Sequence, residues 1–178
     1  MRENTKKHQV HAVRGTVAAV LVGAALIVPG ERIGASVGEQ SDRQLQAGFE
    51  QQPVTIGTPV CSSPTSCVIP FSLTGVSTED MAGTIVQAGA ASLLADGSIY
   101  ANSTLVFTGT VTGCGTGKVT MRSTGVNRGG ATTGSIEIIA GSGTEGLASL
   151  TGAGTVVSGH VDPATGIGTG VIDYKVKC

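Results

Sequence analysis

The sequence predicts an all-β protein, a small closed antiparallel up-and-down β-barrel of about eight strands. From residue 54 onward Thr, Val, Ile, Ser and Gly dominate, and turn residues recur about every ten to fifteen positions, which is typical of sandwiches and barrels. The chain has only three Phe, two Tyr and no Trp, but 28 Gly. An aliphatic core with interior glycines, which let strands coil sharply, favours a small barrel.

The first 36 residues predict a secretory signal peptide. A basic stretch, "MRENTKKHQVHAVR", precedes the uncharged apolar run "GTVAAVLVGAALIV". That run is shorter than the roughly 20 residues of a membrane span, although an uncleaved anchor remains the alternative. Small residues favour cleavage after Ser36, with Ala35 as the neighbouring option. We therefore expect a secreted or cell-envelope protein with no stable membrane span after cleavage.

Residues 37–53, "VGEQSDRQLQAGFEQQP", predict a flexible leader or short helix before a single barrel domain at 54–178. The stretch is polar, rich in Gln and nearly free of β-branched residues. Six basic and ten acidic residues follow Ser36, which leaves a net charge of −4. This charge argues against nucleic acid as a partner.

Eight strands are expected between recurring turn signals. Within "KVTMRST", Val119 and Met121 alternate with Thr120 and Arg122, as in a strand with one buried face. Asp96-Gly97 is a two-residue hairpin signal, and "TGCGTG", "NRGG" and "DPATG" are further turns. The predicted strands cover residues 54–58, 68–74, 82–94, 99–111, 118–125, 133–139, 154–161 and 168–177.

The four cysteines follow the predicted signal peptide and predict two disulfides, with free thiols as the alternative. Three pairings are possible in principle. If the strands run alternately up and down, Cys114 and Cys178 lie at one end of the barrel and Cys61 and Cys67 at the other, which favours these two pairs. No metal site is expected, because there is no Cys-x-x-Cys and only one histidine, His160, follows the signal peptide.

One glycine motif resembles a dinucleotide-binding turn. Residues 141–146 satisfy G-x-G-x-x-G, but Gly152 and Gly154 interrupt the helix that would have to follow. We therefore expect no cofactor. The segment is interpreted as a connection between strands, in which Leu147 and Leu150 plug one end of the barrel.

The stretch "SGHVD" brings nucleophile, base and acid side chains together. In a strand Ser158, His160 and Asp162 would share a face, but they would be spaced too widely for the hydrogen bonds of a catalytic triad. A solvated strand end that enters a turn at Asp162 is the favoured interpretation. His160 stays a candidate general base because imidazole is the usual choice for that role.

The segments "FTGTVTGCGTGKVTMRSTG", "GSIEIIAGSGTEGLASLTGAGTV" and "GTGVIDYKV" resemble an uncharacterised bacterial family of secreted, glycine-rich barrels. That family is grouped with the allene oxide cyclase and dirigent-like barrels. The resemblance covers roughly residues 105–176 and implies a closed antiparallel barrel. Because related barrels include enzymes that enclose hydrophobic substrates in the lumen, it also implies an enzymatic alternative.

Two functions follow as hypotheses. The first is a disulfide-stabilised module that binds a small hydrophobic molecule or serves a structural or interaction role. The second is a cyclase or isomerase that acts on a hydrophobic substrate in the lumen. A cavity of about 300 Å³ or more would favour a ligand or substrate, but few rings and many glycines predict a narrow, filled interior. The candidate ligand contacts are Phe71, Tyr100, Phe107 and Met121, and the candidate acid or base groups are Glu137 and His160.

Overall fold

The computed structural model describes residues 41–63, 66–162 and 164–178. The predicted signal peptide and its cleavage position lie outside these residues. The described chain is almost entirely β-strand, with one short 3-10 helix, η1. In chain order the elements are β1 (Arg43–Ile56), β2 (Val60–Ser63), β3 (Ser66–Ser77), β4 (Met81–Leu93), β5 (Ile99–Val111), β6 (Gly115–Arg128), β7 (Ala131–Ile138), η1 (Glu145–Leu147), β8 (Thr151–Val161) and β9 (Gly168–Lys177).

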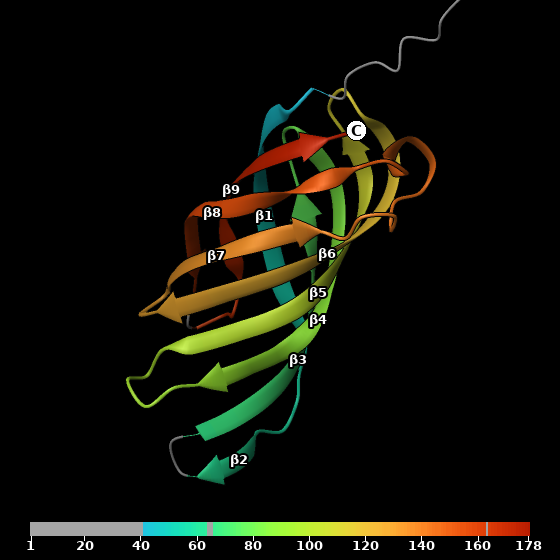
Figure 1. Cartoon of the computed structure of the whole chain (residues 1–178). Coiled ribbons are helices and arrows are strands. Elements are labelled where there is room, and N and C mark those ends of the chain that lie inside the picture. The colour runs from blue at the N-terminus through green and yellow to red at the C-terminus, as the bar shows by residue number, and fades with distance from the viewer. Residues whose placement is uncertain (1–40, 64–65, 163) are drawn as a thin grey trace, which may run out of the picture. The chain divides into compact units, whose positions relative to one another are not determined.

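Eight of the nine strands close into an antiparallel barrel (Figure 1). Consecutive strands from β3 to β9 are neighbours, β9 pairs with β1, and β1 pairs with β3 to close the ring. The remaining strand, β2, extends the edge of β3 beyond this seam. The predicted closed up-and-down barrel is therefore confirmed. The described residues include no helix of the length and apolarity needed to cross a membrane.

Strand β1 corrects the predicted leader. Residues from Arg43 onward, expected to be flexible, form the first barrel strand, and the strand predicted at 54–58 is only its end. Leu45 and Ala47 are buried, while the flanking Gln44 and Gln46 are exposed. A two-residue alternation thus runs through the stretch, and pairing with both β9 and β3 outweighs the weak β-propensity of its glutamines.

The other predicted strands agree with the structure to within a few residues. Strands β5 and β9 have the predicted bounds at both ends. Strand β2 was missed, because a four-residue segment, "VCSS", is too short to show a periodicity. It pairs with β3 so that Cys61 lies directly opposite Cys67.

Both disulfides have the pairing predicted from the strand order. Cys61 bonds Cys67 within the β2–β3 hairpin, with the Cα atoms 3.9 Å apart. Cys114, in the β5–β6 turn, bonds Cys178 at the end of the chain, with the Cα atoms 5.6 Å apart. Figure 1 shows the two locations at opposite ends of the barrel.

The core fills the end of the barrel that contains Cys114. The helix η1 lies against β6 at this end, and Leu147 and Leu150 are fully buried. The G-x-G-x-x-G segment therefore forms a turn and a three-residue helix between antiparallel strands, not a nucleotide-binding unit. The buried apolar residues include Leu45, Ala47, Met81, Val111, Val119, Met121, Ile138, Leu147, Leu150 and Val176.

Glycines on the inner face make room for the few rings. Gly154 lies opposite Tyr174, and a Cβ at Gly154 would come within 2.7 Å of the Tyr174 ring. Gly170 lies opposite Phe49, and a Cβ there would come within 2.7 Å of the Phe49 ring. Each ring thus covers a glycine on the neighbouring strand, an arrangement that protects glycine positions in curved sheets.

Candidate functional site

A cavity of about 560 Å³ occupies the other half of the barrel. The prediction of a filled interior is therefore wrong for this half. The inner positions here carry side chains too small to reach the barrel axis, namely Ala91, Ala101, Gly125 and Gly134. An eight-stranded barrel is just wide enough to be filled by side chains or to hold one small ligand, so small residues on the inner face leave a cavity.

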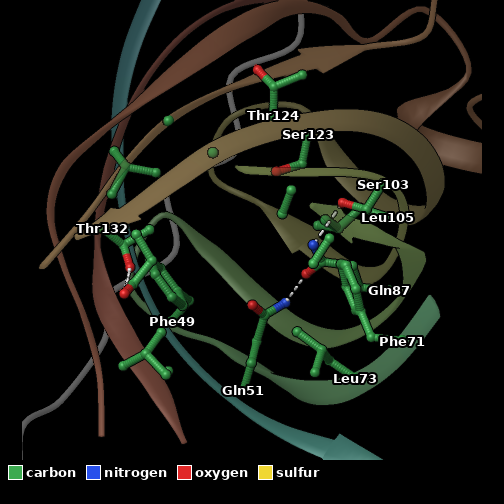
Figure 2. A pocket seen from close by; sticks show the side chains of 18 of the residues that line it. Phe49, Gln51, Phe71, Leu73, Gln87, Ser103, Leu105, Ser123, Thr124 and Thr132 are labelled. Carbon is green, nitrogen blue, oxygen red and sulfur yellow. Dashed lines mark hydrogen bonds between the residues drawn. The ribbon is translucent and has the colours of Figure 1, made fainter. Parts of the chain in front are cut away.

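The cavity walls are mainly apolar (Figure 2). Nearest the mouth are the exposed side chains of Ile56 and Ile99. The described lining residues include no Asp, Glu, Lys or Arg. Deeper apolar lining residues are Phe49, Ile85, Leu105, Ile136 and Ile172, and those nearer the mouth include Ile69, Phe71 and Val161.

A row of polar side chains crosses one wall of this cavity. The Nε2 of Gln51 on β1 donates to the Oε1 of Gln87 on β4 over 2.7 Å. The Nε2 of Gln87 in turn donates to the Oγ of Ser103 on β5, also over 2.7 Å. Gln87 and Ser103 are only 8% and 6% exposed. Figure 2 shows the row, with Ser123 on β6 near Ser103, which it opposes across the two strands. We call Gln51, Gln87 and Ser103 the glutamine–serine row.

Two glycines give this row its space. Gln51 reaches Gln87 across β3, where a Cβ at Gly75 would lie 2.9 Å from the Cγ of Gln51. Ser103 lies opposite Gly89, where a Cβ would come within 2.5 Å of the Cβ of Ser103. A larger residue would also meet a backbone carbonyl oxygen of the neighbouring strand, 2.1 Å from the Cβ at Gly75 and 2.3 Å from the Cβ at Gly89, so strand pairing beside the row depends on both glycines.

Tyr174 lies at the boundary between the cavity and the core. Its side chain is 5% exposed, and it both lines the cavity and belongs to the apolar core. Burial raises the pKa of its hydroxyl well above the ordinary value. The group therefore stays protonated at physiological pH and can act only as a neutral hydrogen-bonding group.

The predicted ligand contacts fall in three different places. Phe71 lines the cavity. Phe107 and Met121 are 1% exposed and belong to the core beneath it. Tyr100 is 39% exposed on the outer face, because its neighbours Ile99 and Ala101 occupy the inward positions of β5. The prediction of a lumenal Tyr100 is therefore wrong.

The predicted acid and base groups are not inside the lumen. Glu137 is exposed on β7 between the buried Ile136 and Ile138, so it faces away from the cavity, which corrects the prediction. His160 is exposed on β8 and lines the cavity only at its mouth, near Gly130. The structure therefore brings neither group close to the glutamine–serine row.

The residues of "SGHVD" do not form a triad. Ser158 and His160 are exposed on β8. The carboxylate of Asp162 accepts hydrogen bonds from the backbone N–H of Ala164, at 2.8 Å, and from the hydroxyl of Thr165, at 3.0 Å. These two bonds hold the pKa of Asp162 below its ordinary value. The predicted turn is thus the structural role of this aspartate.

Sequence reasoning missed the glutamine–serine row. Gln51 lay in the predicted leader, and its role depends on the seam between β1 and β3. Gln87 was the detectable signal, because it stands two residues after the buried Ile85 and so shares its inward face. Within the described residues, no three His, Cys, Asp or Glu side chains are grouped so that they could hold a metal ion.

The comparisons with known proteins support the fold. No protein-family model and no curated protein matches the sequence. The structure is similar to the crystal structure of a protein of unknown function from the DUF3224 family of Shewanella oneidensis MR-1, with a TM-score of 0.57. The two chains are 13% identical, and the match covers 76% of this chain and 96% of that one. This similarity shows a shared barrel fold with a member of an uncharacterised family.

Proposed function

We propose that the protein binds a small, mostly apolar molecule in the open half of its barrel. The observation that carries this proposal is the cavity of about 560 Å³. Ligand sites commonly have volumes of roughly 300–1,000 Å³, with apolar walls and a few polar groups that orient the ligand. The wall formed by residues such as Phe71 and Leu105, crossed by the glutamine–serine row, has this composition.

We also propose that the protein is exported from the cytoplasm. Two disulfides are compatible with an oxidising location outside the cytoplasm. The basic and apolar N-terminal segments of the sequence support cleavage after Ser36. N-terminal sequencing of protein recovered from the medium or the cell envelope tests this, and Val37 is the expected first residue. Retention of residues 1–36 in that fraction would contradict cleavage.

We also propose that the protein is related to the allene oxide cyclase and dirigent-like barrels. The alternative function that this relationship suggests is that of a cyclase or isomerase. That alternative needs an acid or base beside a substrate inside the lumen. Glu137 lies on the outer face and His160 at the mouth. Binding without chemistry therefore has the stronger support.

A neutral fluorescent probe tests the binding proposal. N-phenyl-1-naphthylamine brightens when it moves from water into an apolar site, so the wild-type protein should increase its emission in a saturable manner. Ala101→Phe places a ring at an inner position of the cavity and should abolish most of this signal. Asn102→Phe places the same ring at the next residue, on the outer face, and should leave the signal unchanged.

The two variants separate lumenal binding from attachment to the surface. Circular dichroism should show that both variants keep the β-sheet structure, so that a lost signal reports the cavity. Equal probe binding by Ala101→Phe and the wild-type protein would place the probe elsewhere. Absence of any saturable signal from the wild-type protein would contradict the proposed function itself.

A further inference from the structure

We propose that the ligand is an uncharged molecule with an internal hydroxyl or carbonyl group, apolar on both sides of it, and that Gln87 and Ser103 bind this group. The inference rests on the proposed function, because it assigns the chemistry of a molecule held in the same cavity. Three features carry it: the depth of the glutamine–serine row, its remaining hydrogen-bonding capacity and its uncharged surroundings.

The row lies partway down the cavity, with apolar residues above and below it. On β5 the inward residues run from Ile99 at the mouth through Ala101 to Ser103, and then to the buried Leu105. On β4 Ile85 is the next inward residue below Gln87. A ligand that lies along β4 and β5 therefore meets apolar residues at both ends and reaches the row with a group between them.

Hydrogen bonds within the row leave capacity for one more partner. An amide has two N–H donors, and Gln87 uses one of them on Ser103. Ser103 accepts that bond through its oxygen, so its own hydrogen remains available for donation. Ser123, directly opposite Ser103, adds a second hydroxyl to the same wall. Amides and hydroxyls both donate and accept, so a ligand carbonyl or hydroxyl fits equally.

The surroundings favour a neutral group over a carboxylate. The described lining residues include no Lys or Arg that could pair with an anion at the depth of the row. A buried carboxylate without a cationic partner is strongly disfavoured, whereas a neutral polar group needs only a hydrogen bond. The acidic end of a fatty acid could therefore reach water at the mouth but not the row.

Two isomeric ketones test this inference. Dipentyl ketone has its carbonyl at the centre of the chain, and methyl nonyl ketone has the same atoms with the carbonyl near one end. Their apolar surfaces are nearly equal, so displacement of N-phenyl-1-naphthylamine compares the carbonyl position alone. The wild-type protein should bind dipentyl ketone about three- to tenfold more tightly, as expected for one additional hydrogen bond.

Variants of the row should remove this preference. In Ser103→Ala and in Gln87→Leu the preference should fall below the wild-type value, and in the double variant the two ketones should bind with equal affinity, while the probe still binds. The matched controls Thr104→Ala and Gln52→Leu change exposed residues on the outer face and should keep the wild-type preference. Because Ser103→Ala removes only one hydroxyl, it keeps the test valid if Gln87→Leu does not fold.

The outcomes distinguish this inference from the proposed function. If the wild-type protein binds the probe and both ketones equally well, the cavity binds ligands but the row does not select them, and the inference is wrong. A preference as large as the wild-type value in both Ser103→Ala and Gln87→Leu would also overturn it. If neither the probe nor a ketone binds, both proposals fail.

Discussion

At the scale of single residues, a glycine on the inner face has opposite effects in the two halves of the barrel. Opposite Tyr174, Gly154 leaves room that the ring fills. In the open half Gly125 and Gly134 lie opposite each other, with no ring over them, and both line the cavity. The number of glycines therefore did not predict whether the interior is filled or hollow. What decides this is whether the residue opposite each glycine on the neighbouring strand has a side chain large enough to fill the space.

The first prediction concerns Gly154. Gly154→Val would place its Cβ within 2.7 Å of the Tyr174 ring, and within 2.8 Å of the Cγ2 of Ile172. We expect the free energy of unfolding to fall by about 1–3 kcal/mol, as is common when a packed core is overfilled. Ala153→Val makes a similar change at the adjacent exposed position and should be close to neutral. Denaturation in urea measures both, and equal stabilities of the two variants would contradict the packing argument.

The sequence predicted which residues share a face better than which face is inward. In "KVTMRST" alternation predicted that Val119 and Met121 share a face, and both are buried. Tyr100 was expected in the lumen because ligand cavities are usually lined by aromatic and apolar groups, but it is exposed on β5 between Ile99 and Ala101. The structure puts the smaller residues inside instead, since the register with β4 and β6 fixes the face of the whole strand.

At the scale of elements, β1 is a strand that its local sequence did not predict. Its glutamines have low β-propensity, and its own residues predicted a flexible leader. The strand exists because β9 pairs with residues 43–51 and β3 pairs with residues 49–56. Both partners are distant in sequence, so the short alternation around Leu45 and Ala47 was the only local signal of the strand that closes the barrel.

The second prediction compares the two disulfides. Cys114–Cys178 closes a loop with a sequence separation of 64, whereas the separation between Cys61 and Cys67 is 6. The loss of chain entropy in the unfolded state predicts stabilisation of about 4 kcal/mol for the long loop and about 2 kcal/mol for the short one. Paired alanine variants, each without one disulfide, should differ in this order when their free energies of unfolding are measured. The reverse order would show that strand pairing, not loop length, determines the contribution of each disulfide.

At the scale of the whole molecule, the barrel divides its two roles between its ends. The end closed by η1 buries Leu147 and Leu150 together with most of the core, and a long-loop disulfide joins the strands there. The other end contains the cavity and exposes apolar residues such as Ile56 at the mouth. Packing at the filled end thus stabilises the barrel. The same strands extend from that end and form the walls of the cavity.

The third prediction follows from this division. Ala101 and Phe107 both belong to β5, and each pairs with β4 on one side and β6 on the other. The two residues are six positions apart, an even number, so their amides have equivalent places in the hydrogen-bond pattern of the sheet. Their side chains differ, because Phe107 is packed in the core and Ala101 lines the cavity. Because local opening is easier where fewer apolar contacts are buried, the Ala101 amide should exchange its hydrogen faster.

Addition of dipentyl ketone provides the control for this measurement. A bound ligand supplies the contacts that the open half lacks, so it should slow exchange at Ala101 and leave Phe107 nearly unchanged. Equal exchange rates without ligand would mean that the barrel opens as one cooperative unit in spite of its cavity. If the ligand slowed exchange equally at both amides, both amides would exchange only when the whole protein unfolds. The ligand would then act by stabilising the whole fold against unfolding.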